Sequence, residues 1–139
     1  FTKLSDLAAK LTIITLDDYE KLKPIKQNDS STSFCKKIKK EDGEVDFNSA
    51  KKLFSKYKAY SFWPGIFLKS ELKLKDIEFV ENSSQNIAGE ILEIAKDYIV
   101  VGCKQGRLKI RTLQPPSKNS INSVEYIKGK RLTIGDILN

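Results

Sequence analysis

The sequence predicts a mainly β fold of the α+β class, in which five or six short strands form a small barrel or sandwich. Short runs of alternating apolar residues follow one another in the second half of the chain, separated by Gly, Pro, Asn and Asp. The 139 residues are 40% hydrophobic and 31% charged, which is an ordinary globular balance at a length that can bury a core.

The N-terminal part is predicted to be a helix followed by a linker. Residues 3–22 place apolar side chains at helical spacing, with a break expected within the β-branched residues 12–15. Residues 23–35 are polar and are expected to be extended. The apolar stripe of this helix has no partner helix in the chain, so we expect it to complete a structure further upstream.

A second helix is predicted over residues 49–58, capped by Asp46 or Asn48. It leads into the joint SFWPGIF, residues 61–67, where Pro ends the helix and Gly allows a tight turn. We expect the aromatic side chains of this joint to plug the core where helix meets strand. The alternative is that they stack on bases, as aromatic residues do in single-strand binders.

The strands are predicted over residues 66–70, 72–80, 87–95, 98–103, 107–113 and 131–134. A short helix over 122–128, capped by Ser120 or Asn122, is expected before the last of them. In the run 107–113, Leu108 and Ile110 face one way and the three basic residues face the other.

Several kinds of chemistry are not expected from this composition. The chain has no His, and its two cysteines, Cys35 and Cys103, lie far apart, which argues against zinc and favours free thiols over one disulfide. Without His, acid–base chemistry would need carboxylates, Lys or Tyr. No apolar run approaches the length of a membrane span. Because Met is absent and the chain begins with Phe, we expect it to be a piece of a longer protein.

The net charge of +7 is unevenly distributed. Residues 31–65 include eight basic and four acidic residues, and residues 104–139 include eight basic and two acidic residues. The intervening residues 66–103 include four basic and seven acidic residues. Two basic blocks separated by an acidic one predict a charged face for an anionic partner rather than uniform solubilisation.

Four motifs together resemble the C-terminal half of the methionyl-tRNA formyltransferase family. They are KIKKEDGEVDF, the joint A-Y-x-F-W-P-G, GRLKIRTLQPPSK and YIKGKRLTIGD, in that family's order and spacing. The resemblance implies an OB-like open β-barrel of five or six strands with flanking helices over residues 38–139. It implies that residues 1–37 are the C-terminal helix of a catalytic domain plus an interdomain linker. The chain departs from the family pattern at Lys58, Phe62 and Ser117, where Arg, Pro and Gly are frequent.

The same resemblance implies a function. The parent enzyme would transfer a formyl group from 10-formyltetrahydrofolate to the amino group of initiator methionyl-tRNA, using Asn, His and Asp of an upstream Rossmann-like domain. This piece would carry no catalytic, cofactor-binding or metal-binding residue. Its partners would be initiator tRNA and the catalytic domain, within a cytoplasmic monomer that does not contact membranes.

Ten basic residues are predicted to contact the tRNA: Lys37, Lys40, Lys58, Arg107, Lys109, Arg111, Lys118, Lys128, Lys130 and Arg131. Side chains two residues apart on a strand lie about 6.6 Å apart, which is comparable to the spacing of successive phosphates. The plainer interpretation is that these residues are solvated surface charges or, after the last helix, partners of its dipole.

Two other functions remain open at this point. The chain could be the C-terminal domain of a sugar-nucleotide formyltransferase relative, although the basic tail is not needed there. It could also be a stand-alone OB-like nucleic-acid-binding module, although such a module would not need the unpaired N-terminal helix.

Overall fold

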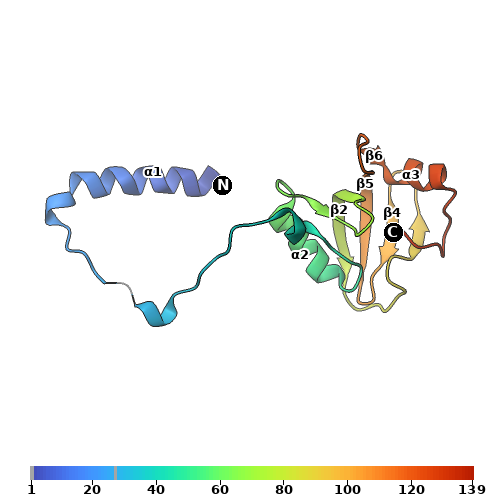
Figure 1. Ribbon diagram of the computed structural model, residues 1–139, viewed down its shortest axis with the longest axis horizontal. Helices are drawn as coiled ribbons and strands as arrows, with labels where there is room; N and C mark the ends of the chain where they lie inside the picture. Colours follow the sequence, from blue (N-terminus) through green and yellow to red (C-terminus); the bar gives the residue numbers. More distant parts are fainter. Residues whose placement is uncertain (1, 27) are drawn as a thin grey trace. The chain divides into compact units, whose positions relative to one another are not determined.

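The computed structural model describes residues 2–26 and 28–139, which divide into two compact units (Figure 1). The first lies within residues 1–36, and the second is Lys37–Asn139. The second unit contains the sheet and all the hollows discussed below.

The first unit is helical. Helix α1, Thr2–Asp17, is followed by two single 3-10 turns, η1 (Tyr19–Lys21) and η2 (Asp29–Ser31). The expected break within residues 12–15 is wrong, because α1 is continuous there. The hydroxyls of Thr12 and Thr15 donate to the carbonyls four residues earlier, at 2.8 and 2.7 Å, so these β-branched residues keep their polar atoms bonded within the helix. No described helix is long and apolar enough to cross a membrane.

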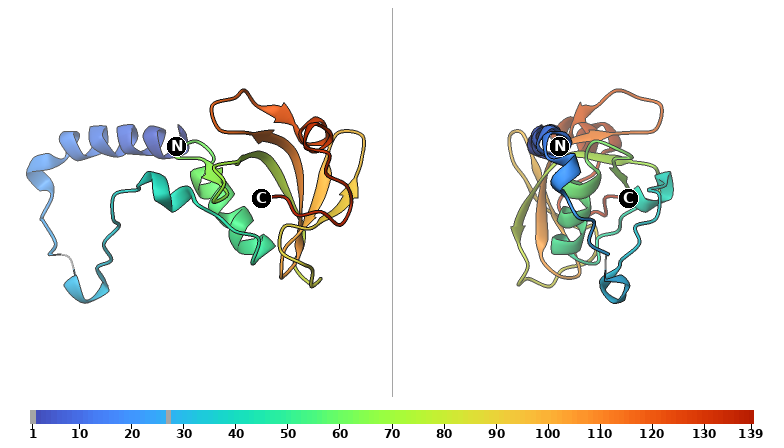
Figure 2. Two further views of the ribbon diagram at one scale, coloured as in Figure 1. Left: turned by 45° about the vertical axis from the view of Figure 1, so that its right-hand side comes forward. Right: turned by 90° about the vertical axis from the view of Figure 1, so that its left-hand side faces the viewer.

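Six strands form one sheet in which every pair is antiparallel. They are β1 (Ile66–Phe67), β2 (Lys73–Glu81), β3 (Ile91–Ile94), β4 (Ile99–Gly102), β5 (Arg107–Gln114) and β6 (Ile121–Asn122). Their order is β1-β2-β5-β4-β3, with β6 beside the end of β5. The edge strands β1 and β3 do not pair with each other, so the sheet is open, and its strands curve around the core (Figure 2). The predicted mainly β fold with an OB-like open barrel is confirmed.

The first five predicted strands are present with shifted or shorter bounds, but the sixth, over 131–134, is wrong. Arg131 ends the preceding helix in a left-handed conformation, with φ of 57°. The N–H of Thr133 then donates to the carboxylate of Asp136 at 2.7 Å and closes a local turn. Because this N–H is bonded within the turn, it is not available to pair with a neighbouring strand. The sixth strand of the sheet is instead β6, which was not predicted.

Two helices flank the sheet: α2 (Ala50–Tyr60) packs on β1 and β2, and α3 (Ser123–Lys130) packs on β5 and β6 (Figure 1). A 3-10 turn, η3 (Lys40–Gly43), precedes α2. Ser49 caps α2, not Asp46 or Asn48, because the Asn48 backbone and side-chain N–H groups donate to the Asp46 carboxylate. Asn122 caps α3, as predicted, by accepting the N–H of Val124 at 2.8 Å.

One hydrophobic core lies between the curved sheet and the two helices. Strand alternation supplies most of it: Leu108, Ile110 and Leu113 of β5 are fully buried, while the basic residues between them face outward. The only buried polar side chain among the described residues, Ser123, donates to the carbonyl of Ile110 at 2.7 Å. That hydrogen bond satisfies the hydroxyl and fixes the start of α3 on β5.

The aromatic joint after α2 does not plug the core as expected. Phe62 is 96% exposed and Trp63 is 52% exposed, and only Ile66 beyond the turn is buried. The N–H of Ser61 donates to Tyr57 and that of Gly65 to Tyr60, each at 2.8 Å. These bonds close the turn on the last carbonyls of α2 and leave the Phe62–Trp63 tip outside.

Candidate functional site

Three surface hollows adjoin one another beside the ends of β1, β2 and β5. The Trp63 hollow, of about 250 Å³, has Tyr57, Trp63, Lys73 and Lys75 among its lining residues. The Phe67 hollow, of about 200 Å³, contains Lys40, Phe67, Lys73 and Pro116. The Tyr126 hollow, of about 500 Å³, contains Pro116, Lys118, Tyr126 and Lys130. Lys73 is shared by the first two and Pro116 by the last two, so the three hollows form one continuous surface.

Five lysines line this surface and define what we call the lysine surface: Lys40, Lys73, Lys75, Lys118 and Lys130. Among the described residues that line the three hollows, Glu71 is the one acidic side chain. Four of the lysines are exposed and Lys73 is half-buried. Such an excess of positive charge on one surface attracts polyanions.

The double-proline loop holds Lys118 in place. The N–H of Lys118 donates to the carbonyl of Pro115 at 3.2 Å, and the side chain of Gln114 donates to the carbonyl of Lys118 at 2.9 Å. Ser117 takes a left-handed conformation with φ of 55°. The loop thus brings Lys118 to the same surface as Lys130 at the end of α3.

The outward-facing basic residues of β5 are paired with acids from neighbouring strands. The Nε of Arg107 lies 3.2 Å from a carboxylate oxygen of Glu81. The carboxylate of Glu78 is shared: the ammonium of Lys109 lies 3.1 Å from one oxygen, and the guanidinium of Arg111 lies 2.6 Å from the other. The antiparallel register places Glu78 opposite Lys109 and Glu81 opposite Arg107. These three predicted tRNA contacts therefore have protein carboxylates beside them.

Hydrogen bonds stabilise the ionised forms of Glu78 and Glu81, but the donors differ. Hydrogen bonds from Arg111 and then Lys109 hold the pKa of Glu78 below its usual value. The side chains of Ser83 and Ser84, followed by the Ser83 backbone, lower the pKa of Glu81 to about 2. Both carboxylates stay ionised at neutral pH and screen the strand's positive charge.

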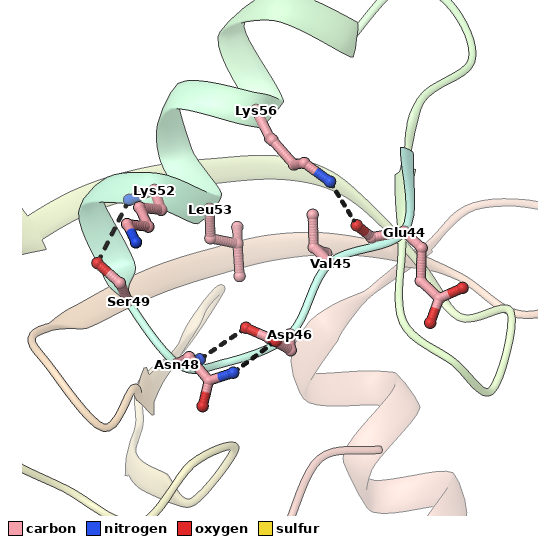
Figure 3. A pocket seen from close by; sticks show the side chains of 8 residues that line it. All are labelled: Glu44, Val45, Asp46, Asn48, Ser49, Lys52, Leu53 and Lys56. Carbon is pink, nitrogen blue, oxygen red and sulfur yellow. Dashed lines mark hydrogen bonds between the residues drawn. The ribbon is translucent and has the colours of Figure 1, made fainter. Parts of the chain in front are cut away.

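A separate hollow of about 300 Å³ lies at the start of α2 (Figure 3). Its two lysines, Lys52 and Lys56, are accompanied by Glu44 and Asp46, and the ammonium of Lys56 donates to the carbonyl of Glu44 at 2.8 Å. Because acidic and basic side chains are equally frequent there, this hollow is less suited to a polyanion than the lysine surface.

The remaining predicted contacts are exposed but spread out. Lys37 lies at the start of the second unit, and Lys58 stands 5.3 Å from the ring centre of Phe54. Lys128 and Arg131 lie at the end of α3. The structure thus brings together Lys40, Lys118 and Lys130, and adds two lysines absent from the predicted set, Lys73 and Lys75. The alternation in the run LKLK, residues 72–75, is the signal that could have revealed them, because its leucines are buried and its lysines face outward.

The two cysteines do not form a disulfide with each other. Cys35 is exposed and Cys103 is buried, and both are free thiols, as predicted. Burial is the main cause that raises the pKa of Cys103, to about 12. The described residues hold no group of three or more His, Cys, Asp or Glu that could hold a metal ion.

The chain is similar to a well-defined set of known proteins. A model of the formyl transferase C-terminal domain matches residues 37–131. Methionyl-tRNA formyltransferase of Sulfurimonas denitrificans is 52% identical over 138 residues, which is 99% of this chain and 46% of that protein. The enzyme of the same name from Nitratiruptor is 48% identical over 136 residues, 98% of this chain and 45% of that protein. The chain therefore spans about half the length of the curated relatives it matches.

Solved structures agree on the fold. A variant of HypX from Aquifex aeolicus matches with a TM-score of 0.65 at 18% identity, over 93% of this chain and 24% of that one. HypX from Aquifex aeolicus in complex with tetrahydrofolic acid matches with a TM-score of 0.62 at 19% identity, over 86% of this chain and 22% of that one. On the family match over residues 37–131, the chain belongs to the formyl transferase C-terminal domain family.

Proposed function

We propose that this chain is the tRNA-binding part of a methionyl-tRNA formyltransferase, in which it binds and orients initiator methionyl-tRNA through its basic side. The observation that carries the proposal is the lysine surface: five lysines and one acid around three joined hollows. The names of the curated relatives, at 52% and 48% identity, support the choice of tRNA as the polyanion.

The lysine surface fits a phosphate backbone better than the outer face of β5 does. A lysine that contacts a phosphate releases condensed counterions, and this release supplies most of the affinity. Lys109 and Arg111 already share Glu78, so a phosphate would have to displace a carboxylate there. Lys118 and Lys130 have no salt bridge with a described acid, so their charges are available to RNA.

The formyl transfer itself is assigned to the part of the relatives that this chain does not cover. No histidine occurs in the 139 residues, so the Asn, His and Asp implied by the family resemblance do not all lie here. We propose that the co-substrate, 10-formyltetrahydrofolate, also binds in that other part. The tetrahydrofolic acid complex of HypX supports a folate as the class of co-substrate. The assignment of residues 1–37 to the end of a catalytic domain plus a linker belongs to the same proposal.

The two alternative functions are less well supported. The relatives at 43 to 52% identity carry the name methionyl-tRNA formyltransferase, and none of those cited is named as a sugar-nucleotide enzyme. A stand-alone module does not explain why the similarity extends over 99% of the chain, including α1.

The test is a salt series of binding to initiator tRNA. If all five lysines contact phosphates, the logarithm of the binding constant falls by about 3.5 to 4.5 per decade of salt, at about 0.7 to 0.9 for each contact. The triple variant Lys73→Ala/Lys118→Ala/Lys130→Ala should bind more weakly and lower this slope by about 2 to 3.

The contrary result is equally clear. A wild-type chain that does not bind tRNA at low salt, or a triple variant with an unchanged slope, would rule out the lysine surface as the interface. Circular dichroism of the variant excludes unfolding as the cause, since its three substitutions remove no fully buried side chain.

A further inference from the structure

The exposed aromatic tip at the end of α2 is unusual because it places large apolar surfaces in solvent. Phe62 is 96% exposed and Trp63 is 52% exposed, although burying such side chains is strongly favourable. Their position is fixed by the backbone bonds of Ser61 and Gly65 to α2. The tip is therefore held out by the turn and is not a loose loop end.

The hollow beside Trp63 has the chemistry of a site for a stacked base. Its lining residues include the rings of Tyr57 and Trp63, the two lysines Lys73 and Lys75, and no acidic side chain. The hydroxyl of Tyr57 donates to the carbonyl of Lys75 at 3.1 Å, which ties α2 to β2 at the wall of the hollow. The volume of about 250 Å³ is below the roughly 300 Å³ at which sites for drug-sized ligands begin, so a single ring system is the appropriate occupant.

We propose that the Trp63 hollow binds one unpaired nucleotide of the bound RNA, with its base stacked on the indole of Trp63 and its phosphate beside Lys73 or Lys75. This inference rests on the proposed RNA-binding function. Aromatic platforms next to a positively charged groove bind single strands without sequence preference, because every base has a π-face.

Charge complementarity selects a nucleotide over a protein surface as the occupant. Lys73 belongs both to the Trp63 hollow and to the neighbouring Phe67 hollow, so the stacking site continues into the lysine surface. One RNA strand can therefore place a base on Trp63 and its following phosphates along Lys73 and Lys40. A purely apolar partner would leave these ammonium groups without counter-charges.

The test uses the fact that Trp63 is the only tryptophan of the chain, so intrinsic fluorescence reports on this site alone. The full chain is titrated with a short single-stranded RNA, with an abasic strand of equal length and charge, and with a duplex. We expect the single strand to quench Trp63 and the abasic strand to bind through the lysines without quenching it.

A variant pair gives the affinity readout. Stacking one base on an aromatic side chain raises the affinity roughly 5- to 150-fold. Because Trp63 is only half-exposed, we expect the low end of this range, so Trp63→Leu should weaken single-strand binding by roughly 5- to 10-fold. Trp63→Phe should retain most of the affinity, and both variants should keep the wild-type salt slope. Circular dichroism checks that both variants fold.

The possible failures can be told apart. Equal quenching by the abasic strand, or a Trp63→Leu variant with wild-type affinity, would overturn the stacking site while leaving tRNA binding intact. A Trp63 signal that changes with protein concentration in the absence of RNA would place another protein surface on the tip and also overturn it. Loss of all salt-dependent tRNA binding would instead be a failure of the proposed function.

Discussion

The guanidinium of Arg111 lies 2.6 Å from the carboxylate of Glu78, and Lys109 contacts the other oxygen of the same carboxylate at 3.1 Å. One acid of β2 thus serves two basic residues of β5, and Tyr98 adds a ring 4.6 Å from the Lys109 ammonium. On the lysine surface, Lys73, Lys75, Lys118 and Lys130 have no such acidic partner among the described salt bridges. Both groups are positively charged, but only in the first would a phosphate have to displace a protein carboxylate.

This difference predicts unequal effects of equal charge removal. Lys73→Gln/Lys118→Gln should lower the salt slope of tRNA binding by about 1.4 to 1.8, the value for two phosphate contacts. Lys109→Gln/Arg111→Gln removes the same charge but should change the slope by less than half as much. Binding titrations at several salt concentrations check this, and equal slopes for the two variants would contradict it.

Acid should destabilise the fold through Glu81. The pKa of this carboxyl is about 2 in the folded chain and 4.5 ordinarily, so the unfolded chain binds more protons between these values. Its contribution is therefore complete above about pH 4.5 and is lost as the pH falls toward 2. Urea unfolding across this range should show a smaller pH dependence for Glu81→Gln, with lower stability at neutral pH. A Glu81→Gln profile that parallels wild type would refute the assignment.

Replacing Ser117 with glycine should stabilise the fold. A non-glycine residue in the left-handed region, such as Ser117, destabilises the folded chain by about 1 to 2 kcal/mol. Glycine avoids this strain, but it gives the unfolded chain more conformational entropy, which lowers the free energy of unfolding by about 0.4 to 1 kcal/mol. Ser117→Gly should therefore raise the free energy of unfolding by about 0 to 1.6 kcal/mol. Thermal unfolding measures the change, with Ser120→Gly in the same loop as the control. A clear loss of stability in Ser117→Gly would show that the hydroxyl has a role that the backbone does not account for.

The two thiols should differ in reactivity. Cys35 is exposed, but Cys103 is fully buried and its pKa is raised to about 12, so it holds little thiolate at neutral pH. A thiol reagent at about pH 8 should label one cysteine per native chain and two in denaturant. The variant Cys35→Ser should remove the native reaction, and rapid labelling of that variant would show that the core opens.

Local patterns were sufficient to predict much of the fold. The alternation over residues 107–113 correctly separated buried Leu108 and Ile110 from the outward basic residues, because side-chain direction in a strand depends only on neighbouring residues. The joint was misjudged because aromatic character alone does not reveal exposure. Its direction is set by the bonds of Ser61 and Gly65 to α2, which depend on how the helix ends.

The candidate site was harder to predict because charge pairing depends on contacts between distant residues. Glu78 meets Lys109 and Arg111 only through the register of β2 against β5. Lys73 and Lys75 lie in the stretch 66–103, which has an acidic net charge, and averaging over that stretch hides two lysines that share the hollows with only one of its acids, Glu71. The folded register, not the local charge count, decides which cations remain free.

The most direct measurement of the central claim is lysine footprinting of the chain with and without initiator tRNA. Amine acylation followed by mass spectrometry reports the protection of each lysine separately. We expect strong protection of Lys73, Lys118 and Lys130 and little change at Lys109, which is already paired with Glu78. Protection of Lys109 with the lysine surface left reactive would contradict it and place the RNA on the outer face of β5.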